Sequence, residues 1–436
     1  MKLTRPIQFI TIFLIVFGLA NLVDATTSSK TYTESFPAVV CPPTLAGLSS
    51  QISLGSTKTQ FQRLQDRTAK TSAVKLLRLP VIADSLLVNS EATTPVVWQS
   101  RAGRWGGAAL CVGPVTSQWF VGASADVTTK GRLVVINSGL SDSIVDIQSF
   151  SENGKQQLQT INVKAKNYSV LAVDSFAPGD KALALLVEPQ SGRVNSFMLD
   201  EQGQGLRSIG GDLINSVSSA SKSITIPAIP TQKPSRGQTI SQGHTIRVLA
   251  PGQVDADITV EVLSTDGVFI PVGLNSRLIS AGQVTEFVLK PEASSEAFAI
   301  RINATEPIVA AVKTRITASG KSDYVWSTPA PELSKSTMAI TGLSPLIVFA
   351  GEQVNVSIDL TLVNGKTVSK SVAGNDIVTW KPPSSARSLT ITKVNKGIFA
   401  GAIVTSVNGI GYFPFAIGSE LAKIEIPDSN IQVLNP

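Results

Sequence analysis

The sequence predicts an all-β protein made of tandem sandwich modules, because of its composition and a strand-and-turn pattern that occurs three times. Apolar residues make up 43% of the 436-residue chain and charged residues only 16%. Val, Ile, Thr and Ser are abundant, a balance that suits the half-buried, pleated surface of a sheet. A chain of this length has room for about three domains.

The chain begins with a segment typical of an export signal. Lys2 and Arg5 precede an apolar run over residues 7–23, and a small-residue cleavage site ends at Ala25. The run is short for a membrane-spanning helix, which needs about 20 residues. Residues 1–25 are therefore predicted to be a signal peptide, with an uncleaved anchor helix as the alternative.

Residues 26–35 are rich in Ser and Thr and are predicted to form a flexible stalk. The chain beyond the signal is then expected outside the cytoplasmic membrane, on its extracellular face or in the cell wall. Contact with the membrane is expected only through the N-terminal segment, if that segment is not cleaved.

Export is expected to place the two cysteines, Cys41 and Cys111, in an oxidising compartment. Thiols in an oxidising compartment tend to pair, so a single disulfide is predicted. Two separate buried thiols are the alternative. A structural zinc site needs four nitrogen or sulfur ligands, which two cysteines without nearby histidines do not provide.

Three stretches share one pattern when they are aligned on Gly154, Gly267 and Gly365. They read VDIQSFSENG, ITVEVLSTDG and VSIDLTLVNG. Apolar and polar residues alternate along each stretch, as a strand with one buried face requires. Each stretch ends in Asn-Gly or Asp-Gly, and this pair is expected to supply the positive φ angles of a tight hairpin turn. The three glycines are therefore predicted to be structural turn residues.

The similarity continues on both sides of each stretch. Upstream of each lies an apolar strand, at residues 133–137, 246–250 and 346–350. Downstream of each, two strands are expected around a short turn, at residues 182–199, 297–314 and 388–405. Several short strands in roughly 100 residues are typical of an immunoglobulin-like sandwich, whereas a propeller blade is about half as long. The predicted fold is a row of immunoglobulin-like β-sandwich modules preceded by a signal or anchor helix.

Changes in composition mark the expected boundaries, because stretches rich in Ser, Pro and Gly separate the copies. The predicted segments are 1–25 (signal or anchor), 26–35 (stalk), 36–120 (a disulfide-bearing segment that packs on the first repeat), 121–215 (first repeat), 216–318 (second repeat with a leading linker) and 319–436 (third repeat with a leading linker).

Several classes of function lack support in the sequence. The net charge of +6 is modest, and Lys and Arg are scattered, so no nucleic-acid partner is predicted. The single histidine, His244, lies in no serine-hydrolase or zinc-hydrolase motif. Asp146, Glu261 and Asp359 lie on the polar faces of separate repeats, where solvated acids are common. We therefore expect no catalytic residues, no metal and no cofactor.

Aromatic and basic residues gather in one region. Trp98, Arg101, Arg104, Trp105 and Trp119 lie in VVWQSRAGRWGGAALCVGPVTSQWFVGAS, on both sides of a cysteine. Exposed tryptophans beside arginines stack on sugar rings and bind anionic polymers, so these five residues are the candidate binding surface. The alternative is that the rings pack against the disulfide and cover the first sandwich.

The motifs CPPTLAG at 41–47, CVGPVTSQWFVGAS at 111–124 and DYVWSTPAPEL at 323–333 are similar to those of an exported actinobacterial family, a domain of unknown function. The pattern consists of a Cys-Pro start and a second Cys-x-Gly-Pro followed by Trp-Phe-x-Gly. The resemblance covers nearly the whole exported length. It implies an actinobacterial envelope location, and it brings no activity and no catalytic residues with it.

The leading functional hypothesis is a non-catalytic envelope protein that serves as a scaffold or binding module. Its partner would be cell-wall polysaccharide or an exported envelope protein. Two alternatives remain open at this stage. One is a carbohydrate-active enzyme that uses paired carboxylates, and the other is an assembly chaperone that binds peptides by strand addition.

Overall fold

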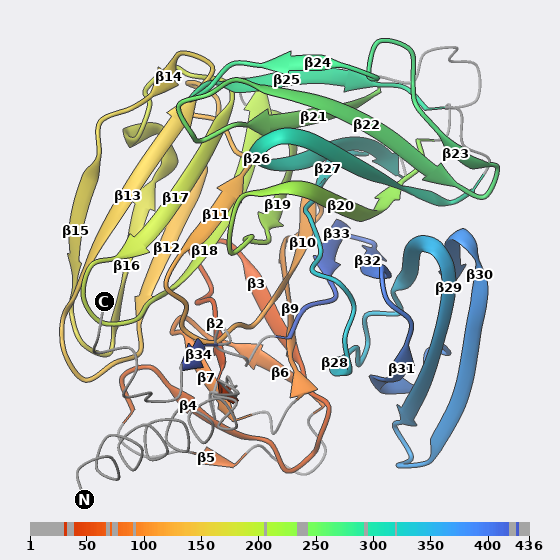
Figure 1. Cartoon of the computed structure of the whole chain (residues 1–436). Coiled ribbons are helices and arrows are strands. Elements are labelled where there is room, and N and C mark those ends of the chain that lie inside the picture. Colours follow the sequence, from red (N-terminus) through yellow and green to blue (C-terminus); the bar gives the residue numbers. More distant parts are fainter. Residues whose placement is uncertain are drawn as a thin grey trace, which may run out of the picture. The chain divides into compact units, whose positions relative to one another are not determined.

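The computed structural model is almost entirely β, as predicted (Figure 1). One short 3-10 helix, η1 (Val173–Ser175), interrupts the strands of the described chain. The chain divides into two compact units, Phe36–Glu420 and the two chain ends Met1–Ser35 with Leu421–Pro436. The structure describes residues 30–32, 39–66, 70–71, 77–89, 93–204, 207–232, 243–291, 295–318, 321–417 and 424–426.

The unit of the chain ends contributes one pair of strands. β1 (Lys30–Tyr32) pairs antiparallel with β34 (Ile424–Ile426). Part of the predicted stalk is therefore a strand. The predicted signal or anchor segment, residues 1–25, lies outside the described residues. In the part of the chain that is described, no helix is long and apolar enough to cross a membrane.

Module N is the first sandwich of the larger unit and the part that the sequence did not identify as a repeat. Its strands are β2 (Val39–Cys41), β3 (Ser49–Ser53), β4 (Gln60–Arg63), β5 (Lys70–Thr71), β6 (Arg78–Val81), β7 (Leu86–Asn89), β8 (Thr93–Thr94), β9 (Val96–Arg101) and β10 (Trp105–Leu110). All of them except β8 form two sheets, one in the order β10-β9-β3-β6 and the other in the order β2-β7-β4-β5. β8 instead pairs in parallel with β28 (Ser336–Ala339). The predicted disulfide, Cys41–Cys111, is present and joins the two cysteines in the core of this module.

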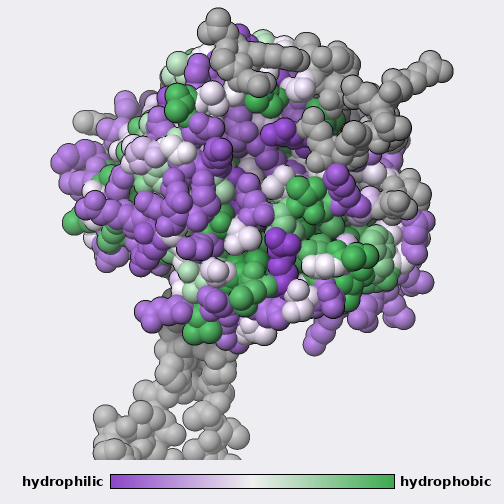
Figure 2. All heavy atoms as spheres, turned by 90° about the horizontal axis from the view of Figure 1, so that it is seen from above, coloured by the Kyte–Doolittle hydropathy of each residue, from purple (hydrophilic) through white to green (hydrophobic). Residues whose placement is uncertain are grey.

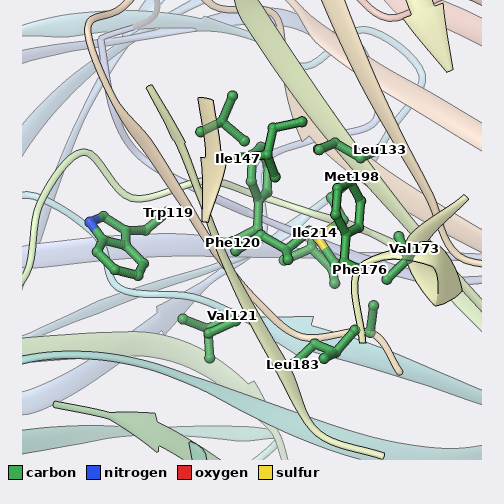
Figure 3. Close-up of a cluster of buried hydrophobic side chains, with 14 of the residues drawn as sticks. Trp119, Phe120, Val121, Leu133, Ile147, Val173, Phe176, Leu183, Met198 and Ile214 are labelled. Carbon is green, nitrogen blue, oxygen red and sulfur yellow. The ribbon is translucent and has the colours of Figure 1, made fainter. Parts of the chain in front are cut away.

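Module A follows, and its core is drawn in Figure 3. Its strands are β11 (Gln118–Val121), β12 (Arg132–Asn137), β13 (Ser143–Ser151), β14 (Gly154–Lys155), β15 (Gln159–Val163), β16 (Asn167–Ala172), β17 (Leu183–Pro189), β18 (Asn195–Gln204) and β19 (Arg207–Ile214). One sheet has the order β11-β17-β13-β14, with β15 also on β13, and the other has the order β16-β12-β18-β19. Phe120, Leu133 and Met198 come from different strands and meet between the two sheets.

Module B contains the longest strand. Its strands are β20 (Ser221–Pro230), β21 (His244–Leu249), β22 (Ala256–Ser264), β23 (Gly267–Phe269), β24 (Arg277–Ile279), β25 (Val284–Leu289), β26 (Ala297–Ala318) and β27 (Lys321–Ser327). The first half of β26 pairs with β20 and β22, and its second half pairs with β21 and β27, so one strand serves both sheets. Because β27 pairs with β26, the second repeat extends beyond the predicted boundary at residue 318.

The turn predicted within residues 297–314 is absent. The corresponding turns of the other two repeats contain Gly192 and Gly397, which have φ angles of 73° and 74°. The second repeat has Thr305, Glu306 and Pro307 there and no glycine. Pro307 has no N–H for a ladder, and it lies just after Ala304, the last β26 residue paired with β22. β26 therefore continues without a turn from the sheet of β20 and β22 into the sheet of β21 and β27.

Module C is built around a second long strand. Its strands are β28 (Ser336–Ala339), β29 (Leu346–Leu362), β30 (Thr367–Trp380), β31 (Ala386–Val394), β32 (Phe399–Ser406) and β33 (Gly409–Pro414). β29 includes both the upstream apolar strand and the amphipathic strand of this repeat. Its register on β30 shifts between Gly351 and Gln353, where the first two repeats have a loop instead.

All four modules in the described part of Phe36–Glu420 have the same topology. The strands are counted in chain order without β8, with β14 and β15 taken as one strand, β23 and β24 as one, and each half of β26, β29 and β30 separately. One sheet is then 1-6-3-4 and the other is 5-2-7-8. An immunoglobulin domain places its first strand beside the second and its last beside the sixth. Here the first strand pairs with the sixth, the seventh pairs with the second, the fourth lies beside the third, and an eighth strand follows the seventh.

The repeated stretches occupy the predicted position, strand three of their modules, with the predicted face inward. Val145, Ile258 and Val356 are fully buried. Gly154, Gly267 and Gly365 have φ angles of 106°, 111° and 86°, as turn glycines require. The prediction that the preceding Asn or Asp also has a positive φ is wrong, because these turns need the left-handed conformation only at the glycine.

The eighth strands of the modules meet at one place, which we call the junction. β10 lies against β19 and β33, and β27 lies against the same two strands. Glycines let the backbones approach closely. A Cβ on Gly107 would lie 2.5 Å from the Leu213 nitrogen, and one on Gly411 would lie 2.5 Å from the Ala108 nitrogen. The junction therefore holds modules N, A, B and C together through main-chain contacts.

Candidate functional site

The three tryptophans of the predicted binding surface are buried in three different cores. Trp105 is 0% exposed and packs with the disulfide in module N. Trp98 is 7% exposed and belongs to the core of module C, and Trp119 is 7% exposed in the core of module A. The prediction of an exposed aromatic platform is therefore wrong for these rings. The alternative, packing beside the disulfide, describes Trp105.

The two arginines of the predicted surface have different surroundings. Arg101 forms an ion pair with Glu201, with Nε 2.8 Å from Oε1, and so connects module N to module A. Arg104 is exposed in the turn between β9 and β10. The five residues singled out in the sequence do not form one surface.

His244 is a core residue of module B. Its side chain is buried, its Nδ1 lies 2.8 Å from the Thr314 hydroxyl, and its ring packs edge-on against Phe298. Burial lowers the pKa of His244 from 6.5 to about 4. The imidazole is thus held neutral inside the sandwich.

We expect acid to weaken the protein through His244. As the pH falls below 6.5 the unfolded chain binds a proton at this residue, while the folded chain binds one only near pH 4. The free energy of unfolding should then drop by roughly 3 kcal/mol between these values. Urea titrations of the wild-type protein and of His244→Gln, repeated from pH 7 to pH 4, measure this loss as the difference between the two proteins. Parallel curves would contradict the prediction.

The acids considered for paired-carboxylate chemistry do not form a pair. Asp146, Glu261 and Asp359 lie on β13, β22 and β29, in three different modules. Each has a local partner: Thr160 donates to Asp146 at 2.6 Å, and Ser369 donates to Asp359 at 2.6 Å. Glu261 pairs with Arg301.

The fold instead brings together three other acids, at the junction. Asp212 is fully buried and accepts a hydrogen bond from the Trp326 backbone N–H at 2.7 Å. Asp200, its cross-strand neighbour, accepts one from the Trp326 indole N–H at 2.9 Å. Burial raises the pKa of Asp212 well above its ordinary value, and the nearby Asp323 raises it further.

Asp323 connects strands of the three other modules. Its carboxylate accepts hydrogen bonds from the backbone N–H groups of Gly211 and Ile410, both at 3.1 Å, and of Gly106 at 3.4 Å. Burial raises the pKa of Asp323 to about 7, although these donors favour the ionised form. Its arrangement is that of a structural clamp. The sequence offered no signal for it, because the donors come from distant strands.

A buried lysine completes the polar network. Lys313 donates to the Gln202 side chain at 2.6 Å, and its ammonium lies 3.9 Å from the centre of the Tyr324 ring. The Gln202 amide in turn donates to Asp200 at 3.2 Å. Burial lowers the pKa of Lys313 to about 8. In the described chain, no group of three or more His, Cys, Asp or Glu residues is arranged to hold a metal ion.

Two hollows open beside the junction. One is a cleft of about 530 Å³ between modules B and C, which we call the B–C cleft. Ile316, Leu346 and Ile403 give it apolar walls, and Asp323 also lines it. An ion pair between Lys381 and Glu296, at 2.7 Å, crosses from module C to module B.

The other hollow, the N–C pocket, has a volume of about 240 Å³ and lies between modules N and C. The outer face of the sheet β10-β9-β3-β6 supplies one wall, where Gln51 is directly opposite Trp98 on the neighbouring strand. The end of β32 and the turn after it supply the other wall. The residues that line it are Ser49, Gln51, Arg78, Trp98, Ser100, Gly342, Leu343, Val404, Thr405, Ser406, Val407 and Asn408.

Arg78 is the charged residue of the N–C pocket. Its side chain lies over Gly342, where a Cβ would come within 2.6 Å of Arg78 Cδ. Its Nε is buried, and the guanidinium has no hydrogen bond or ion pair with another described residue. Burial lowers the pKa of Arg78 from its ordinary value. Trp98 is the one residue of the predicted surface that lines this pocket. Arg78 was missed because the pairing of β6 with β3 and of β3 with β9, and not nearness in the sequence, brings it to the pocket that Trp98 also lines.

Exposed apolar side chains collect on module B. Figure 2 views this side of the molecule and shows hydrophobic residues gathered among hydrophilic ones. The exposed members in this module are Val254, Val268, Phe269, Ile270, Val272, Leu278 and Val288. Four of them, Val268, Phe269, Ile270 and Val272, lie in β23 or directly after it.

The fold and the two hollows define an all-β protein of four sandwich modules joined at a polar junction. The chain belongs to a family of unknown function, DUF5719, whose model matches residues 82–374. The family resemblance found in the sequence is thereby confirmed, while the actinobacterial origin stays a prediction. A comparison with curated proteins found no match.

Three solved structures share some similarity with the chain. "Thermotoga maritima 1070" is 13% identical, covers 23% of this chain and 93% of its own, and has a TM-score of 0.21. A tetra-tandem repeat in the extending region of a large adhesion protein is 10% identical, with coverages of 88% and 92% and a TM-score of 0.12. The BSP domain of a biofilm-associated protein is 6% identical, with coverages of 93% and 97% and a TM-score of 0.14. Similarities this low carry no functional argument.

Proposed function

We propose that this protein is a non-catalytic, exported cell-envelope protein that acts as a scaffold or binding module. Its partner is cell-wall polymer or another exported protein. The observation that supports this proposal best is the junction, where strands of all four described modules are joined through close main-chain contacts and the carboxylate of Asp323. A body joined in this way holds its surface sites in fixed geometry, and preorganisation of that kind favours binding.

The titratable groups that hydrolysis would use have structural partners here. His244 is bound to Thr314 inside a sandwich, and Asp212 is bound to the backbone of Trp326. Neither is placed as a base beside a nucleophile or a water-accessible acid. Strand addition is disfavoured at one edge of each module, because β10, β19, β27 and β33 face the junction.

The proposed location is the outer face of the cytoplasmic membrane or the cell wall. The disulfide between Cys41 and Cys111 supports it, because such bonds persist in oxidising compartments. The export signal predicted at residues 1–25 points the same way.

The test is a binding and turnover experiment with the purified full chain. Isolated wall material is incubated with the protein and sedimented, and the supernatant is analysed for released sugars. In parallel, a tagged copy is crosslinked in cells and its partners are identified. We expect co-sedimentation or one defined exported partner, without release of sugars. Absence of both kinds of binding, or sugar release that an Asp→Asn or Glu→Gln replacement abolishes, would refute the proposal.

A further inference from the structure

The N–C pocket contains a positive charge that the described chain leaves unbalanced. Arg78 lines it with no ion pair to another described residue, and the described residues of the pocket lining include no acidic side chain. A half-buried guanidinium with a buried, unpartnered Nε is costly unless a partner satisfies it. The planar fork of arginine matches a carboxylate or a phosphate through two parallel hydrogen bonds.

The rest of the lining is suited to hydroxyl groups. Ser49, Ser100 and Ser406 carry hydroxyls, and Gln51 and Asn408 carry amides that both donate and accept. Trp98, although mostly buried in the core of module C, also borders the pocket. Groups that both donate and accept hydrogen bonds match the hydroxyls of a polyhydroxylated ring.

The volume of the pocket limits the size of the ligand that it can bind. Its volume of about 240 Å³ is below the roughly 300–1,000 Å³ of sites for drug-sized ligands. It therefore accommodates a single ring or side group of a longer molecule. Such a site binds one unit of a polymer, and the rest of the polymer lies outside the pocket.

We propose that the N–C pocket binds an anionic sugar unit, in which Arg78 pairs with a carboxylate or phosphate while the neighbouring hydroxyls and amides bind the ring. This inference rests on the proposed polymer-binding function and names the chemical group that the site recognises. Because the pocket lies between modules N and C, the fixed arrangement of these modules also fixes the distance between Arg78 and the donors of β32.

Calorimetric titration of the full chain with three probes tests this assignment. Glucuronate carries a carboxylate, glucose 6-phosphate carries a phosphate, and glucose is neutral. We expect at least one charged probe to bind about tenfold or more tightly than glucose, as a charge-assisted hydrogen bond implies. Whichever charged probe binds better identifies the source of the oxyanion. If neither charged probe binds better than glucose, the proposal fails.

Two variants and one control localise the binding. Arg78→Gln should abolish the preference for the charged probe, and Gln51→Trp should block the pocket while keeping the arginine. Arg104→Gln, at an exposed position of the same module, should bind as the wild type does, and circular dichroism verifies that each variant folds. Unchanged binding by both pocket variants would overturn the assignment. An Arg78→Gln protein that is retained on wall material and also keeps the preference for the charged probe would leave the proposed function intact and refute only this site.

Discussion

Replacing Gly107 by alanine is expected to lower the free energy of unfolding by about 3 kcal/mol, the upper end of typical overpacking costs. A Cβ at this position would lie 2.5 Å from the Leu213 nitrogen and 2.6 Å from the Asp212 carboxylate. Both neighbours belong to β19, and the Leu213 atom is main chain, so no side-chain rotation relieves the clash. The strands β10 and β19 would have to separate. Gly411→Ala should behave in the same way through β33 and Ala108.

Gly252→Ala is the matched control, because no heavy atom lies within 4 Å of a Cβ there. Its free energy of unfolding should stay within about 0.5 kcal/mol of the wild type, as surface substitutions usually do. Urea unfolding followed by tryptophan fluorescence reports on the junction, since Trp105 and Trp326 lie next to it. Equal stability of Gly107→Ala and Gly252→Ala would show that the glycines are not needed for close approach.

Arg247→Met is expected to cost about 4 kcal/mol, a loss typical of breaking a buried charged network. Arg247 extends from β21 into module A, where NH1 donates to the carbonyls of Ala123 and Leu183 at 2.5 and 3.0 Å. Its guanidinium also pairs with Glu286 at 2.7 Å and lies 4.8 Å from the Trp326 ring. Removing it takes a donor from the carbonyls of Ala123, Leu183 and Lys181 and from the Glu286 carboxylate.

Arg247→Lys separates charge from geometry in the same measurement. A lysine keeps the positive charge but lacks the planar fork that reaches these carbonyls and the carboxylate at once. We expect it to recover less than half of the lost stability. Arg301→Met is the control, because its pair with Glu261 is partly exposed and should be worth about 1 kcal/mol or less. An Arg247→Met protein as stable as Arg301→Met would contradict this role.

The parts of the fold that the sequence predicted correctly rest on local signals. Alternating polarity identified the buried faces around Val145, Ile258 and Val356, and turn glycines identified the ends of those strands. Two cysteines in a chain with a predicted export signal led to the prediction of the disulfide. Each of these signals is contained in a few neighbouring residues or in one pair of thiols.

Module N escaped detection because its local signals are weak. Its third and fourth strands, β4 and β5, span only residues 60–63 and 70–71, and no Asn-Gly or Asp-Gly pair joins them. The same sheet order forms nonetheless, so tertiary packing overrides weak local preference here. The candidate site likewise combines a residue that local sequence signals identify with one that only tertiary packing brings to it. Trp98 was singled out from the sequence, whereas Arg78 joins it only when β6, β3 and β9 align.

By itself, the sequence of this protein determined the all-β class, the inward face of each repeated strand and the pairing of its thiols, because those depend on periodicity and on residue type. Only the tertiary structure decided that Trp98, Trp105 and Trp119 enter three separate cores, that Asp323 bonds to three other modules, and that Arg78 faces a pocket. These depend on contacts between strands far apart in the chain, where burial and backbone geometry determine which groups meet.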